Sequence, residues 1–211
     1  TADHNAGFEW RRRLGRGHSV FTGYDYGIFS FKGQAPGSDR HASNVGWGYA
    51  SRMGIAFSLA AGYNILLPDD QAAETASGLN VNATTGYNGG VVSYSAGYRQ
   101  GITDGGGAFA NAQSSSTHGT FRANFTRSLS AEVAVAGHVN ERIRVTGGAP
   151  QDETIRSVSS RAQVSMRLGA HVGANAAWTR HAQAVSSSAI ATPATDLRTN
   201  RYSIGLTWST R

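Results

Sequence analysis

Residues 55–65 read Ile-Ala-Phe-Ser-Leu-Ala-Ala-Gly-Tyr-Asn-Ile, and this stretch decides the fold class. Apolar residues occupy every second position, and small or polar residues stand between them. Successive side chains of a β-strand point to opposite faces, so a period of two predicts a strand with one apolar and one polar face. Residues 133–139, Val-Ala-Val-Ala-Gly-His-Val, repeat the pattern much further along the chain.

The alternation predicts an all-β protein with eleven strands. They cover residues 8–14, 19–31, 43–51, 54–66, 78–86, 90–100, 117–127, 130–143, 154–167, 170–182 and 197–209. Many of these segments span about 9–14 residues. An ordinary globular strand has about 5–6 residues, whereas a tilted membrane strand needs about 9–11. Strand length therefore favours a transmembrane barrel.

The connections between these strands alternate between short and long. Short ones fall near residues 15–17, 51–53, 87–89, 127–129 and 168–169, and long ones cover 32–42, 67–77, 101–116, 144–153 and 183–196. All four prolines, Pro36, Pro68, Pro150 and Pro193, lie in the long ones, as expected for a residue that cannot donate to a β-ladder. Short periplasmic turns and long outer loops are typical of outer-membrane barrels.

Composition agrees with this interpretation. Hydrophobic residues make up 39% of the chain, which is low for a packed soluble core, and no apolar run is long enough for a membrane helix. Hydropathy does not detect barrels, because lipid-facing and lumen-facing residues alternate along their strands. The chain has no cysteine, which excludes disulfides and thiolate metal sites. The net charge is +6, but the arginines are scattered, so we expect no nucleic-acid partner.

Three segments carry a resemblance to a known family. They are Gly97-Tyr-Arg-Gln-Gly-Ile-Thr-Asp-Gly-Gly-Gly107, then His118-Gly-Thr-Phe-Arg122, then the turn Thr126-Arg-Ser-Leu-Ser130. With these segments the chain resembles the uncharacterised porin-like outer-membrane β-barrel proteins of Gram-negative bacteria. The resemblance implies a barrel in the bacterial outer membrane, contact with outer-membrane lipid and no catalytic residues. One departure is the C-terminus: such barrels often end in an aromatic residue, whereas here Ser-Thr-Arg follows Trp208.

Strand number leaves the closure of the barrel open. Bacterial single-chain barrels normally have an even number of strands, and an unpaired edge cannot face lipid. We therefore expect a transmembrane antiparallel up-and-down β-barrel of about twelve strands. Three explanations fit an odd count: a strand precedes Thr1, a strand around 78–90 is miscounted, or the edge pairs with another chain. Residues 1–211 form one domain, either a processed mature chain or the C-terminal part of a longer one.

The alternation assigns candidate residues to each face. Charged and polar positions define the expected lumen lining: Arg11, Arg13, Arg99, Arg122, Glu132, His138, Asn140, Arg142, Arg161 and Arg167. Aromatic residues on the apolar register suit the membrane–water boundary because they combine an apolar body with a polar tip. These girdle candidates are Trp10, Trp47, Tyr49, Tyr98, Trp178, Tyr202 and Trp208.

No pattern predicts catalysis, a cofactor or a metal. Asp69-Asp70 could be an acid pair, but acidic loop tips are usually only solvated. The histidines lack metal-ligand spacing, and Gly105-Gly106-Gly107 lacks the Gly-Lys-Ser/Thr ending of a phosphate loop.

We therefore expect a structural barrel or passive pore, anion-preferring if it conducts, because positive charges predominate on the lumen register. One alternative is a non-conducting barrel that anchors or sheaths a partner, either another envelope protein or a further copy of the chain. Another is a soluble β-propeller-like binding protein, since short turns recur at intervals of about 40 residues.

Overall fold

The computed structural model describes residues 2–30, 37–69, 75–103, 112–142, 153–187 and 195–208. They form eleven strands: β1 (Ala2–Gly15), β2 (His18–Ser30), β3 (Ser38–Ala50), β4 (Ile55–Pro68), β5 (Ala76–Asn88), β6 (Val92–Thr103), β7 (Ala112–Asn124), β8 (Leu129–Arg142), β9 (Glu153–Arg167), β10 (Val172–Ser187) and β11 (Thr195–Trp208). The predicted all-β class and all eleven strands are confirmed. In the described part of the chain, no helix is long and apolar enough to cross a membrane.

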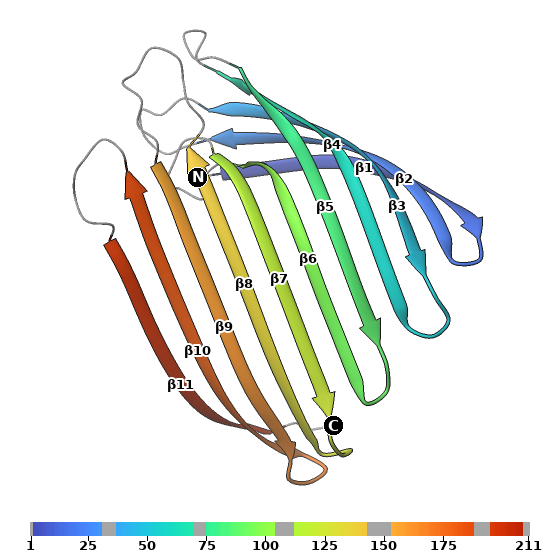
Figure 1. The fold of residues 1–211 in the computed structure, drawn as a ribbon, viewed down its shortest axis with the longest axis vertical. Helices are drawn as coiled ribbons and strands as arrows, with labels where there is room; N and C mark the ends of the chain where they lie inside the picture. Colours follow the sequence, from blue (N-terminus) through green and yellow to red (C-terminus); the bar gives the residue numbers. More distant parts are fainter. Residues whose placement is uncertain are drawn as a thin grey trace.

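All eleven strands belong to one antiparallel sheet in which each strand pairs with the next along the chain. Figure 1 shows this meander as a twisted, curved sheet, with the short turns gathered at one end. A propeller would instead divide into separate blades of four strands. The propeller-like architecture is therefore wrong for the described residues.

The sheet has two open edges, β1 and β11. No ladder joins these two strands in the described residues, so the closed barrel of about twelve strands is not present. The two edge strands, β1 and β11, run in the same direction. Each strand is antiparallel to the one before it, and the direction reverses an even number of times between β1 and β11. The C-terminal end of each of these two strands lies at the end of the sheet where the short turns are (Figure 1).

The tight turn between β1 and β2 depends on left-handed backbone. Gly15, Arg16 and Gly17 have φ angles of 94°, 47° and 87°. Glycine adopts this region without the Cβ clash that other residues meet, which accounts for the Gly-Arg-Gly sequence. A Cβ at Gly17 would collide with the backbone carbonyl oxygen of Ala50 at the end of β3. The first turn is thus packed against the start of the next one.

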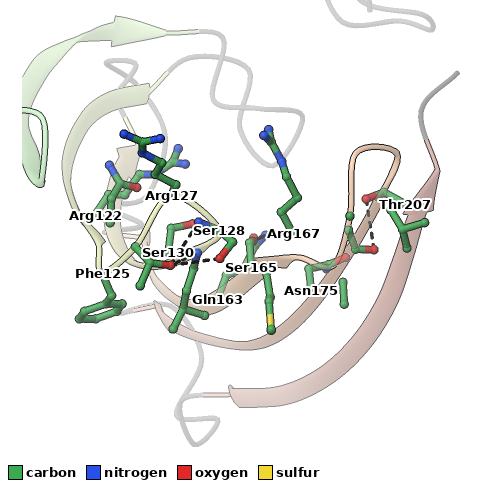
Figure 2. Close-up of a pocket in the computed structure, with 18 of the residues that line it drawn as sticks. Arg122, Phe125, Arg127, Ser128, Ser130, Gln163, Ser165, Arg167, Asn175 and Thr207 are labelled. Carbon is green, nitrogen blue, oxygen red and sulfur yellow. Dashed lines mark hydrogen bonds between the residues drawn. The ribbon is translucent and has the colours of Figure 1, made fainter. Parts of the chain in front are cut away.

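Strand registers keep the two faces chemically distinct across the sheet. Leu59 lies opposite Trp47 on β3 and Ala83 on β5, whereas its neighbour Ala60 lies opposite Gly46 and Asn82. We call the face that carries Leu59 the convex face and the face that carries Ala60 the concave face. Figure 2 shows the curvature at one end of the sheet, where Arg122 and Arg167 lie on the hollow side.

Large apolar side chains on the convex face are exposed from one edge of the sheet to the other. Representative exposed fractions are 66% for Phe8 on β1, 45% for Leu59 on β4, 47% for Val135 on β8 and 90% for Ile204 on β11. Soluble monomers rarely expose contiguous apolar surface on this scale. The convex face therefore needs an apolar environment or a partner.

The concave face is more crowded at the β2–β4 side of the sheet. Phe21, Ala42 and Leu66 are buried there. The ring of Phe21 covers Gly46, where an added Cβ would lie 2.6 Å from a ring carbon. Leu66 packs with Ile102 of β6. Side chains thus fill part of the concavity.

Several strands begin or end further from the short turns than expected. β7 begins at Ala112 rather than at 117, and β3 begins at Ser38 rather than at 43. Ladder hydrogen bonds need only backbone groups, so pairing continues where apolar alternation has stopped. Pro68, expected in a loop, is the last residue of β4, a position where proline costs the ladder little.

Candidate functional site

Every lumen-lining candidate falls on the concave register. Arg11 and Phe21 are cross-strand partners, as are Arg122 and Glu132. The other candidates follow the same register: Arg13 on β1, Arg99 on β6, His138, Asn140 and Arg142 on β8, and Arg161 and Arg167 on β9. The side chain of Arg142 lies outside the described residues. These candidates share a face but do not form one cluster. Arg99 lines one hollow of the described structure, Arg122 and Arg167 line another, and the remaining described candidates line neither.

The first hollow has a volume of about 470 Å³ and lies on the concave face between β1 and β7. Asparagine side chains dominate its polar lining: Asn5, Asn44, Asn64, Asn80 and Asn82. Glu9, Asp25, Arg40 and Arg99 place both signs of charge in it. These asparagines were not among the lumen-lining candidates predicted from the sequence. Asn80 and Asn82 could have been assigned to the concave face, because they alternate with the apolar residues Leu79 and Val81.

Asn64 is the most buried of these amides, with 3% of its surface exposed. Its Oδ1 atom is buried without a hydrogen-bond partner in the described structure. Nearby on the same face, Arg11 donates from Nε to Oε1 of Glu9 at 3.0 Å and its guanidinium lies 4.7 Å from the Phe21 ring centre. The Arg11–Glu9 pair is about half exposed, so it and the cation–π contact orient the Arg11 side chain but contribute little to stability.

The second hollow, of about 1000 Å³, lies at the short-turn end of β7–β11. Arg122 enters it from β7, Arg127 from the β7–β8 turn and Arg167 from the end of β9. Figure 2 shows these three side chains on the hollow side of the curved sheet, whereas Phe125 lies on the other side. Arg127 was not a candidate, because it lies in a turn where alternation carries no information.

Aromatic side chains gather on the convex face near the short turns. Trp47 stacks with His18 at a centroid distance of 5.6 Å and meets Phe57 at 5.5 Å. His171 and Trp208 lie 6.4 Å apart in a stacked arrangement. Of the other girdle candidates, Tyr49 lies 4.9 Å from His18, and Trp10, Tyr98, Trp178 and Tyr202 share the convex register. Sequence reasoning missed His18 and Phe57 as parts of this group.

At the opposite end of the strands the convex face carries polar pairs beside exposed apolar side chains such as Ile28 and Leu67. Tyr26 donates a hydrogen bond to Asp39 at 2.8 Å, and the Tyr24 hydroxyl lies 2.6 Å from Nδ1 of His41. On β11, Arg198 and Asp196 form an ion pair at 2.6 Å. The convex face at this end of the strands is therefore mixed in character.

The described residues contain no group of three or more His, Cys, Asp or Glu side chains that could hold a metal ion. Asp69 is exposed, while Asp70 and Gly105-Gly106-Gly107 lie outside the described residues. The structure therefore adds nothing to the interpretation of Asp69-Asp70 as a solvated loop tip or of Gly105-Gly106-Gly107 as a glycine run without a phosphate-loop ending.

A scan against protein-family models gives no match for this chain, and a search of curated proteins gives none either.

Proposed function

We propose that the chain forms the wall of a transmembrane β-barrel in the bacterial outer membrane, as a structural barrel or passive pore. The observation that carries this proposal is the exposed apolar band of the convex face, which extends from Phe8 on β1 to Ile204 on β11. Hydrocarbon is the environment that such a band suits, because lipid removes apolar surface from water without requiring a shaped partner.

Strand length and the polar pairs near one end of the strands support lipid over a protein partner. Strands of 12–16 residues exceed the roughly 9–11 that a tilted strand needs to cross a bilayer, so they would extend beyond it. The polar pairs Tyr26–Asp39 and Arg198–Asp196 occupy the part that would project into water. Trp47 and Trp208 would lie at the other boundary, where aromatic girdles are found.

A barrel in a membrane requires partners for the edges of β1 and β11. Convex side chains at the β11 edge are unusually exposed, as at Tyr202 with 77% and Leu206 with 76%. Because β1 and β11 run in the same direction, one added strand antiparallel to both would complete a twelve-stranded meander. We include such a strand, with apolar residues on its convex register, in the proposal.

Charge on the concave face supports a preference for anions if the barrel conducts. Among the residues whose side chains the structure describes, arginines on this face outnumber acids, which are Glu9, Asp25 and Glu132. A water-filled path lined by excess positive charge concentrates anions and repels cations.

A non-conducting barrel is the second candidate, and the packed part of the concave face favours it. Phe21, Leu66 and Ile102 are 7%, 0% and 3% exposed, so side chains already occupy the β2–β6 side of the interior. Twelve strands would enclose only a modest lumen, and this packing narrows it. Such a barrel would anchor or sheath a partner instead of passing solutes.

Reconstitution in planar lipid bilayers tests the proposal and separates the two candidates. A passive pore gives discrete conductance steps, and a potassium chloride gradient gives a reversal potential of the sign expected for anion preference. Stable insertion without steps indicates the non-conducting barrel. A chain that stays monomeric and folded in buffer without detergent contradicts the membrane proposal.

A further inference from the structure

The second hollow combines several cations with an absence of acids. Its lining includes Arg122, Arg127 and Arg167 but no aspartate or glutamate. Among the described residues, none of these three side chains takes part in an ion pair or a hydrogen bond. Glu132 lies opposite Arg122 in the β7–β8 register and shares a small adjoining hollow with it, but the two form no ion pair. Like charges gathered in one concavity repel, and a bound anion would remove that repulsion.

The turns that carry these arginines are held together by backbone hydrogen bonds. Arg167 donates from its backbone N–H to the carbonyl oxygen of Ser128 at 2.7 Å. Within the β7–β8 turn, the hydroxyl oxygen of Thr126 accepts from the N–H groups of Ser128 at 3.2 Å and Leu129 at 3.0 Å. Arg127 and Arg167 therefore start from backbone positions that are fixed relative to each other, which reduces the ordering cost of binding between them.

Neutral donors surround the arginines. Ser130, Ser165, Asn175 and Thr207 line the same hollow. Figure 2 shows Asn175 and Thr207 on the same side of the sheet as Arg167. The Ser130 and Ser165 hydroxyls and the Asn175 amide can donate to the oxygens that the guanidinium groups leave free. The Thr207 hydroxyl instead donates to the carbonyl oxygen of Gly173. Arginine presents planar pairs of N–H donors that match the oxygens of phosphate, so this lining suits an oxyanion better than chloride.

We propose that the second hollow is a binding site for a multiply charged phosphate-class anion, such as pyrophosphate or a phosphomonoester. Several arginines without acids match two or more negative charges. The arginines lie on the concave side, away from the convex face proposed to meet lipid, so the ligand is a free anion and not a lipid headgroup. The site does not require the chain to conduct, and in a barrel it would lie at the short-turn mouth.

Calorimetric titration tests the site on the full chain in non-ionic detergent at low ionic strength and about pH 8, where phosphate carries nearly two charges. Pyrophosphate is the probe, and chloride at equal ionic strength is the control. The variants are Arg127→Gln and Arg167→Gln, and the matched control is Arg201→Gln, which removes the same charge from the concave register outside the hollow.

We expect saturable pyrophosphate binding that weakens roughly tenfold or more in each hollow variant, because a hydrogen bond to a charged group is lost. Binding by Arg201→Gln should stay within about twofold of the parent, since the charge removed there lies outside the hollow. Arg127→Lys keeps the charge but loses the planar donor pair, so it should bind with intermediate strength. Circular dichroism and detergent-resistant migration check that each variant folds.

Three results would overturn the site. They are the absence of saturable binding to the parent, equal weakening in Arg127→Gln and Arg201→Gln, and binding of phosphatidylglycerol micelles without binding of pyrophosphate. Pyrophosphate binding by a chain that gives no conductance would contradict the pore and leave the site intact.

Discussion

Trp47 and Leu59 lie directly opposite each other across β3 and β4, on the convex face, with 39% and 45% of their surfaces exposed. Such a pair would normally be buried in a soluble sheet protein, because hiding it from water contributes about 25 cal/mol per Å². Across the sheet the same exposure recurs at Val135 and Ile204. The lipid-facing proposal rests on this repeated exposure.

Charge on the convex face should destabilise the inserted protein. Replacing Leu59 or Val135 by arginine should lower the free energy of unfolding by about 2–4 kcal/mol in bilayers, because a guanidinium near the midplane loses its hydration. Asn140→Arg, on the concave face of β8, should change it little. Urea titrations of the protein in lipid vesicles measure all three, and equal costs on both faces would mean that the faces are assigned wrongly.

Orientation can be tested on intact cells. Outer-membrane barrels have short periplasmic turns and long outer loops, so the long connections should project outside the cell. Added protease should cut within 67–77, 101–116 or 183–196 and spare the short turns. Mass spectrometry of the fragments locates the cuts, and cleavage confined to 15–17 or 127–129 would reverse the orientation.

Gly15 and Gly17 offer a matched pair in the first turn. Both have positive φ, but a Cβ at Gly15 meets no atom within 4 Å, whereas one at Gly17 meets the carbonyl of Ala50. Gly15→Ala should cost about 1–2 kcal/mol from backbone conformation alone. Gly17→Ala should cost about 1–3 kcal/mol more, because the collision adds to the strain. Unfolding titrations in detergent compare the two, and equal costs would contradict the packed turn.

Gly46 makes room for Phe21. Gly46→Ala should destabilise the protein by about 1–3 kcal/mol, because a Cβ would collide with the Phe21 ring and approach the carbonyl oxygen of Leu59. In a Phe21→Ala background part of this cost should disappear. A double-mutant cycle measures the coupling, and fully additive effects would mean that the ring does not lie over Gly46.

Local and global features of the fold differ in how well the sequence predicts them. The strand at 54–66 could be located because each apolar residue marks its own face, and β4 spans Ile55–Pro68. The start of β7 at Ala112 could not be located from the sequence. Residues 113–117, Gln-Ser-Ser-Ser-Thr, have no apolar alternation and join the sheet through their backbone. Closure could not be predicted either, because it depends on edges far apart in the chain.

The candidate site shows the same division. Arg122 and Arg167 could be assigned to the concave face from alternation alone. Their association with Arg127 could not, because it depends on the backbone hydrogen bond between Arg167 and Ser128 that joins two separate turns. The five asparagines of the first hollow lie on four strands, β1, β3, β4 and β5, so only the strand registers bring them together.

The most direct test of the membrane proposal uses the absence of cysteine from the chain. A single spin-labelled cysteine is placed in turn at each position from 130 to 139 of β8, and its accessibility to oxygen and to a water-soluble nickel complex is measured in lipid vesicles. Spin labels at odd-numbered positions such as 133 and 135 should be accessible to oxygen but not to the nickel complex, because these positions face lipid. Labels at even-numbered positions should lack this lipid signature. Equal access of nickel to both sets would contradict a lipid-facing convex face.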